Sequence, residues 1–130
     1  MPLHIIPDTN FLIYSAKYKI DLESELSQIL SENYDIILLD IIREELLKHA
    51  KSTGMKKHDA TLSLKLLIHL EKKGSVKEEP APEGAKNADH ALIKLDSAEN
   101  IIATMDKKLK SKFKHAKILS VRQKTHLAFI

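Results

Sequence analysis

Short apolar runs alternate along the chain with longer segments in which apolar residues recur every three or four positions. Residues 3–6, 35–39, 100–104 and 117–121 are mainly apolar runs of strand length, which predict buried strands. Residues 22–32 and 58–73 have helical spacing, with Leu62, Leu66 and Leu70 at i, i+4 and i+8. This alternation predicts an α/β fold, with a mostly parallel sheet of four to five strands flanked by helices on both faces.

Capping and turn residues mark where these segments begin and end. Residues 75–86 contain two prolines and a glycine among charges, and predict a loop with one short strand around Val76. Gly74 ends the helix over residues 58–73, and the apolar tail 126–130 is either an edge strand or a contact surface. The residues predicted to cap or open helices are Asp8, Thr9 or Asn10, then Asp40, Asn87 and Asp106.

Composition places the chain among ordinary globular proteins. Its 130 residues suit one domain over 1–130, and 43% hydrophobic with 30% charged residues is typical of soluble domains. No apolar run could span a bilayer and no secretory signal follows Met1, so we expect a cytoplasmic protein with no membrane association. The lack of cysteine excludes disulfides and thiolate metal sites, which favours Mg²⁺ or Mn²⁺ for any bound metal.

The positive charge is concentrated near the C-terminus. The net charge of +3 permits nucleic-acid binding without requiring it. Between Lys107 and Lys124 there are seven lysines, one arginine and no acid. This run is either a solvated helix face or a set of phosphate contacts, and the sequence leaves both interpretations open.

Four acids lie close to the predicted strand ends. Asp8 ends the first strand and Asp106 follows the strand over residues 100–104, while Glu45 and Asp89 lie near the start of two helices. Ligands of open parallel sheets bind beyond the carboxyl ends of the strands, so these carboxylates could converge there. Their mutual repulsion would favour a divalent cation. Helix capping, first-turn charge and solvated surface are the structural alternatives, and spacing alone does not decide between them.

The four acids occur in four motifs that together extend over nearly the whole chain. They are residues 5–12 (IIPDTNFL), 41–46 (IIREEL), 87–93 (NADHALI) and 101–109 (IIATMDKKL). The chain thereby resembles the PIN domain family of metal-dependent ribonucleases, whose motifs are an apolar strand before Asp-Thr/Ser-Asn, a Glu before Leu, an Asp after a loop, and Thr-x-Asp. The resemblance implies a single PIN-like domain.

The resemblance also implies roles for individual residues. Asp8, Glu45, Asp89 and Asp106 would be the catalytic residues and the ligands of Mg²⁺ or Mn²⁺. Glu44 remains an alternative to Glu45. A second group would support the ligands, with Asn10 orienting Asp8 and Thr104 holding a water or ligand; Asp96 and His90 are interpreted as charged or packed residues outside the site.

The implied reaction is metal-dependent hydrolysis of RNA, which leaves a 5′-phosphate and a 3′-hydroxyl. Single-stranded or looped RNA fits best, because the metals must reach an exposed phosphate. Candidate phosphate contacts are Lys107, Lys108, Lys110 and Arg122. With only 5% aromatic residues, we expect little readout by base stacking.

The biological setting has several alternatives. The helix over 58–73, the loop 75–86 and the closing segment 118–124 resemble an archaeal subgroup related to nucleases of small-subunit rRNA processing, which favours rRNA processing or RNA maturation. A VapC-type toxin shares the four acids, and a non-catalytic RNA-binding assembly module would share the fold. A receiver-like domain ranks low, because the acid pair beside its first strand is missing. A homodimer, a ribosome-assembly factor and an antitoxin are candidate partners.

Overall fold

The computed structural model describes residues 2–130, which form six strands and six helices, with one or two helices between successive strands except between the last two. The strands are β1 (Leu3–Pro7), β2 (Tyr34–Leu39), β3 (Val76–Glu79), β4 (Asn100–Ala103), β5 (Lys117–Arg122) and β6 (His126–Phe129). The helices are α1 (Thr9–Lys17), α2 (Leu22–Ile29), α3 (Asp40–Lys51), α4 (Lys57–Lys72), α5 (Ala88–Lys94) and α6 (Lys107–Lys110). None of the described helices is long and apolar enough to cross a membrane.

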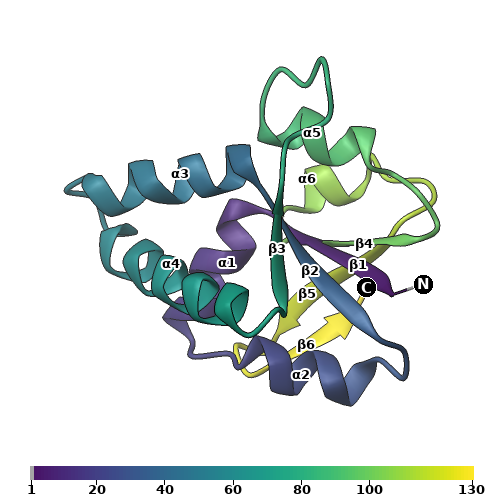
Figure 1. Cartoon of the computed structure of the whole chain (residues 1–130), viewed down its shortest axis with the longest axis horizontal. Coiled ribbons are helices and arrows are strands. Elements are labelled where there is room, and N and C mark those ends of the chain that lie inside the picture. The colour runs from purple at the N-terminus through teal and green to yellow at the C-terminus, as the bar shows by residue number, and fades with distance from the viewer. Residues whose placement is uncertain (1) are drawn as a thin grey trace.

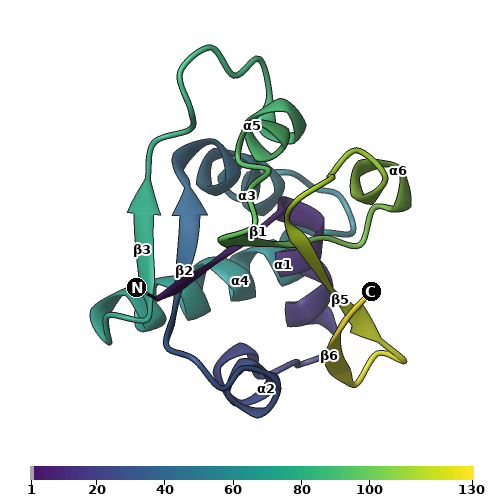
Figure 2. The ribbon, with the colours of Figure 1, turned by 90° about the vertical axis from the view of Figure 1, so that its right-hand side faces the viewer.

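The strands form one sheet in the order β3-β2-β1-β4-β5-β6, parallel except for β6. The chain moves from β1 through β2 to β3 in one direction, and from β3 through β4 to β5 in the other. Because such crossovers are right-handed, these two groups of connections lie on opposite faces of the sheet. Figure 1 shows α1, α3 and α4 together on one side and α5 and α6 on the other, as predicted, and Figure 2 agrees.

The direction of winding reverses between the neighbouring strands β1 and β4. At their carboxyl ends the connections leave toward opposite faces, and this is the place where open α/β sheets form a ligand crevice. The ladder continues past both strands, because Asp8 N–H donates to the Ala103 carbonyl at 2.9 Å and Thr104 N–H donates to that of Leu119 at 3.0 Å. The first and fourth motifs therefore leave the sheet side by side.

The core follows the apolar runs predicted to be strands. Residues 36–39 of β2 are all buried, as expected for a strand covered on both faces. In α4, however, the buried residues include Ala60, Ser63 and Leu67, whereas Leu62 and Leu66 are 38% and 36% exposed. A strict i, i+4, i+8 series turns by about 40° per step around a helix, so it leaves the core face that an i, i+3, i+7 series follows.

The tail adds a sixth strand where four to five were predicted. β6 pairs antiparallel with β5, from Leu119 opposite Phe129 to Arg122 opposite His126. The turn between them holds Gln123 and Lys124 at φ values of 54° and 59°. Hairpin turns of this left-handed type usually contain Asn or Gly, so the sequence carried no signal for it.

Candidate active site

Asp8 lies at the centre of the crevice between β1 and β4. Its side chain is 7% exposed, and Oδ1 accepts a hydrogen bond at 2.7 Å from Phe11 N–H, which caps α1. The Thr104 hydroxyl donates to Oδ2. The pKa of Asp8 is raised to about 6, mainly by burial and further by the charges of Asp89 and Asp106, although the hydrogen bonds from Thr104 and Phe11 act in the opposite direction. Two other predicted acids, Asp89 and Asp106, thus lie within electrostatic reach of Asp8.

Thr104 connects Asp8 with the fourth motif. While its hydroxyl donates to Asp8, Thr104 Oγ1 accepts a hydrogen bond from Asp106 N–H at 3.0 Å. Asp106 then caps α6, where Oδ1 accepts from Lys108 N–H at 2.9 Å and from Leu109 N–H at 3.2 Å. Thr104 therefore fixes both a carboxylate rotamer and the direction in which the chain leaves β4.

Glu45 is bonded to the residue that follows Asp8, which the sequence suggested only as a helix cap. Thr9 lies at the start of α1, and its hydroxyl donates to Glu45 Oε1 of α3. Glu45 is half-buried, whereas Glu44 is exposed on the outer side of the helix. This contact favours Glu45 as the acid of the second motif, and the position of Thr9 directly after Asp8 was the signal for its role.

Asp89 reaches the site from α5, whose N-terminus Asn87 caps by accepting from His90 N–H at 2.8 Å. The preceding loop is anchored by Asp40, whose Oδ1 accepts from Ala81 N–H at 2.9 Å. His90 Nδ1 accepts from Lys86 N–H at 3.0 Å, so this histidine is part of the loop structure. Asp89 itself is exposed, and the described residues include no hydrogen-bond partner for its carboxylate.

The remaining extra acid, Asp96, has a structural role away from the crevice. Its carboxylate accepts hydrogen bonds at 2.7–2.9 Å from N–H groups of three consecutive residues, Lys114, His115 and Ala116. Burial raises the pKa of Asp96, but these three bonds together lower it below its ordinary value. Asp96 thus orders the loop before β5.

The carboxylates do not form a closed metal cage. Among residues 2–130, no group of three or more His, Asp or Glu side chains is positioned to hold a metal ion. The donor set still suits Mg²⁺ or Mn²⁺, because it consists of carboxylate oxygens around an aspartate whose pKa is raised mainly by burial and further by the charges of Asp89 and Asp106. The exposed Asp89 carboxylate has room to turn toward Asp8, whereas Asp106 Oδ1 is held by N–H groups of α6.

The predicted supporting and RNA-binding residues lie in three different places. Asn10 is exposed, and its Oδ1 accepts from Lys56 Nζ at 2.9 Å, so the donors that orient Asp8 are Thr104 and Phe11 N–H instead.

Lys107, Lys108 and Lys110 are on α6, directly after Asp106. Arg122 is in the β5–β6 hairpin, where Lys124 Nζ lies 5.3 Å from the ring centroid of Tyr18, at the end of α1 farthest from Asp8.

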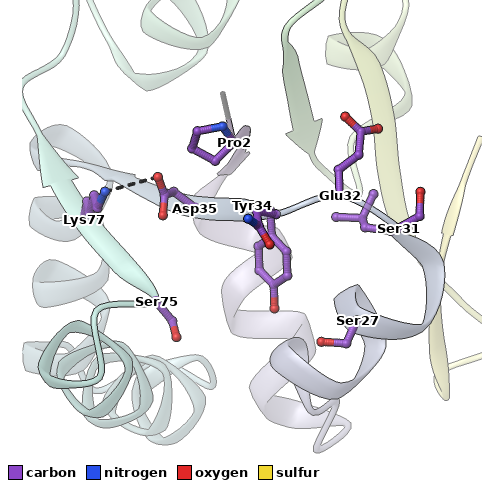
Figure 3. Close-up of a pocket in the computed structure, with 10 residues that line it drawn as sticks. Pro2, Ser27, Ser31, Glu32, Tyr34, Asp35, Ser75 and Lys77 are labelled. Atoms are coloured by element: carbon purple, nitrogen blue, oxygen red, sulfur yellow. Dashed lines mark hydrogen bonds and ion pairs between the residues drawn. The ribbon is translucent and has the colours of Figure 1, made fainter.

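A cavity of about 990 Å³ lies at the amino ends of β1 and β2, at the opposite end of these strands from Asp8. Figure 3 shows Pro2, Tyr34 and Asp35 around it, with Lys77 directed at Asp35. Lys77 Nζ and Asp35 Oδ2 form an ion pair at 3.2 Å. Another cavity, of about 460 Å³, includes Asn10 and Met105 in its wall, and in the sequence these residues lie close to Asp8 and directly before Asp106.

The fold and this crevice define a class of α/β protein with an acidic site where the sheet reverses its winding. Residues 5–124 match the model of the PIN-like domain family, and the chain belongs to that family. Ribonuclease VapC4 of Methanocaldococcus jannaschii is 33% identical over an alignment of 126 residues, and the alignment covers 94% of this chain and 92% of that protein.

Two solved structures share the fold. The PIN domain endonuclease Utp24 superposes with a TM-score of 0.74 at 24% identity, over 98% of this chain and 91% of that chain. VapBC2 from Rickettsia felis, bound to a DNA fragment from its promoter, superposes with a TM-score of 0.62 at 16% identity. That superposition covers 92% of this chain and 100% of the other. At these identities the two structures support the fold of this chain and no particular reaction.

Proposed function

We propose that this protein is an endoribonuclease that hydrolyses RNA phosphodiester bonds with Mg²⁺ or Mn²⁺ at the crevice between β1 and β4. The observation that carries the proposal is Asp8, a buried carboxylate at the point where the winding reverses, with the charges of Asp89 and Asp106 close enough to act on it. The relative VapC4, which covers nearly all of this chain, is named a ribonuclease.

Asp8, Glu45, Asp89 and Asp106 would hold the cation. A bound divalent cation would offset their negative charge, acidify water and stabilise charge on the phosphate. The chain's own contribution is to fix the ligands: Thr104 and Phe11 N–H orient Asp8, Thr9 orients Glu45, and backbone N–H groups of α6 hold Asp106. Such supporting contacts hold carboxylates in rotamers that can bind metal.

Single-stranded or looped RNA is the substrate that suits this crevice. The exposed Lys107 and Lys108 follow Asp106 directly, so they can contact phosphates next to the cleaved one. Duplex RNA would hold its phosphates in a rigid helix, whereas a single strand can present one phosphate to the carboxylates.

A toxin ribonuclease of a toxin–antitoxin pair is a second candidate for the biological setting. It is favoured by the 33% identity to VapC4, since the likeness to Utp24 at 24% identity supports only the fold. A role in rRNA processing remains the alternative. Inducing the protein alone and together with the product of any adjacent small gene distinguishes them: growth arrest that the second protein relieves supports the toxin, and unaffected growth supports RNA maturation.

Incubation of purified protein with end-labelled single-stranded and hairpin RNAs tests the reaction. Wild-type protein should cut with Mn²⁺ or Mg²⁺ and not in EDTA. Asp106→Asn should lower the rate more than about 100-fold, because it removes a ligand charge. Asp21→Asn is the matched control, because Asp21 also caps a helix through a hydrogen bond to its backbone, but at α2, outside the crevice.

The comparison separates the alternatives. Metal-dependent cutting by wild type and Asp21→Asn, without cutting by Asp106→Asn, supports the proposed reaction. Equal cutting by all three proteins contradicts the site. If all three bind RNA and none cuts it with either metal, the chain is a non-catalytic RNA-binding module.

A further inference from the structure

A groove lies between α1 and the start of α4. Its volume is about 460 Å³, and its lining includes Asn10, Tyr14, Lys17, Met55, Lys56 and Met105. Met105 directly precedes Asp106 in the sequence, and Asn10 is two residues after Asp8, so the chain leads from the wall of the groove to two of the predicted acids.

The groove combines apolar and cationic side chains in a way that ordinary packing does not require. Met55 is 96% exposed, although a methionine on a surface normally gains from burial. Lys56 Nζ donates to Asn10 Oδ1 at 2.9 Å, which holds its ammonium group against a residue two positions after Asp8 in the sequence. Tyr14 provides an aromatic ring in the same wall.

The aromatic and basic groups continue along α1 beyond the groove. The rings of Tyr14 and Tyr18 lie 4.7 Å apart between centroids. Lys17 Nζ is 5.4 Å from the Tyr18 ring and Lys124 Nζ, from the β5–β6 turn, is 5.3 Å from it. Aromatic rings interleaved with cations are the arrangement that binds single-stranded nucleic acid, by base stacking and by neutralising phosphates.

We propose that this groove binds a nucleotide of single-stranded RNA next to the phosphate at the acidic site. The base packs against Tyr14 and the two methionines, Met55 and Met105. Phosphates lie near Lys56 and Lys17, and the strand continues over Tyr18 toward Lys124. Asp59 repels phosphate but can accept a hydrogen bond from an amino group, so the base edge faces Asp59. The assignment of the neighbouring phosphate rests on the proposed function.

The larger cavity, of about 990 Å³, does not suit this role. Its lysine, Lys77, is paired with Asp35, and the carboxylate of Glu32 adds negative charge (Figure 3). It also lies at the amino ends of β1 and β2, away from the carboxylates. Phosphate binding therefore favours the groove beside Asn10.

Binding of a fluorescent single-stranded RNA in EDTA, where the chain cannot use metal, tests the groove separately from cleavage. Tyr14→Leu should weaken Kd about tenfold, and Tyr14→Phe, which keeps the ring, should change it less than about twofold. Tyr34→Leu, at the amino end of β2, is the matched control. Lys56→Gln should lower the salt dependence of binding by about one phosphate contact, whereas Lys65→Gln on the exposed side of α4 should not.

RNAs with one abasic nucleotide locate the base. At one position the abasic change should weaken binding to wild type and have little further effect on Tyr14→Leu, because both remove the same contact. Equal Kd for Tyr14→Leu and Tyr14→Phe, with both proteins folded by circular dichroism, overturns the groove even if wild type cuts RNA. Binding that depends on Tyr14 without any cleavage supports the groove and overturns the proposed reaction alone. No RNA binding by wild type overturns both.

Discussion

At the scale of single residues, Asp8 combines burial with neighbouring negative charge. A carboxylate 7% exposed near Asp89 and Asp106 is unfavourable when ionised and no cation is present, which is why its pKa rises to about 6. A site that functions by binding cations can retain such a group, because the binding of the cation compensates for the repulsion. Asp8 should therefore cost stability in the metal-free protein at neutral pH.

Asp8→Asn should stabilise the metal-free protein at pH 8 and change it little at pH 4. The folded protein holds the Asp8 proton up to a pKa of about 6, against 3.8 for an unperturbed group. The contribution of Asp8 protonation to the free energy of unfolding is therefore fully present below pH 3.8 and is lost as the pH rises through 6. The full difference corresponds to about 3 kcal/mol at pH 8. Urea unfolding in EDTA at both pH values measures it.

Asp96→Asn provides a control of opposite sign. Because its three backbone hydrogen bonds lower the pKa of Asp96, its contribution to stability is present near neutral pH and disappears as the pH falls through the folded pKa. Asp96→Asn should therefore destabilise the protein at pH 7, and the loss should shrink in acid. If both variants showed the same pH trend, the shifts assigned to Asp8 and Asp96 would be wrong.

The sequence indicated the acids but not how each is held. Asp8 and Asp106 could be placed at one edge because each follows an apolar run, and the structure confirms that these strands are neighbours. The choice between Glu44 and Glu45 depended on the rotation of α3 relative to Thr9, which is a tertiary contact. The hydrogen bond between Lys56 and Asn10 joins residues far apart in sequence, so no local pattern could predict it.

At the scale of elements, Asp106 has two roles that substitution can separate. It caps α6 through hydrogen bonds from two backbone N–H groups, and it contributes charge to the crevice. Asn is as good an N-cap as Asp, whereas Ala is not, so Asp106→Ala should cost about 1 kcal/mol of stability and Asp106→Asn much less. Thermal unfolding measures this, and both variants should lose RNA cleavage. Cleavage that survives in Asp106→Asn alone would assign Asp106 to structure.

The β5–β6 turn stores backbone strain that glycine should relieve. Gln123 has a φ of 54° and is exposed, so Gln123→Gly loses no packing and should raise stability by about 0.5–1 kcal/mol. Gln28→Gly, in helix α2 and equally exposed, should lower it by about 1 kcal/mol. Chemical denaturation of the two variants provides the comparison, and a loss of stability in Gln123→Gly would contradict the turn.

Element boundaries were easier to predict than faces. Caps such as Asn87 and Asp106 mark helix starts directly in the sequence, because their side chains accept hydrogen bonds from the next turn. The buried face of α4 was harder to predict, because apolar residues occur nearly all around this helix. The series that contains Leu62 and Leu66 does not mark the buried face, since both side chains are partly exposed. The hairpin turn after β5 contains Gln123 and Lys124 in place of the usual Asn or Gly. The sequence therefore could not decide whether residues 126–130 form an edge strand or a contact surface.

At the scale of the whole molecule, the topology places two cationic groups on either side of the carboxylates. Helix α6 lies on one face of the sheet, and α1 and α4 lie on the other (Figures 1 and 2). Lys107, Lys108 and Lys110 are residues of α6, whereas Lys17 and Lys56 line the groove between α1 and the start of α4. An RNA strand whose phosphate reaches Asp8 could therefore extend across the sheet edge in both directions. Net charge alone could not predict this, because +3 says nothing about where the cations lie.

If RNA crosses the edge in this way, the two groups should contribute independently to binding. Lys107→Gln combined with Lys108→Gln should weaken binding and reduce its salt dependence by about two phosphate contacts, whereas Tyr14→Leu should weaken binding with little change in salt dependence. In the triple variant, which combines all three substitutions, the loss of binding free energy should equal the sum of the two separate losses to within about 0.5 kcal/mol, because the groups share no partner. Anisotropy titrations of an RNA long enough to reach both groups measure this. An RNA shortened on one side should become insensitive to either the lysine substitutions or Tyr14→Leu, and stay sensitive to the other. A triple variant no weaker than either parent would mean that both groups contact the same nucleotide, and would contradict a strand that extends over both faces.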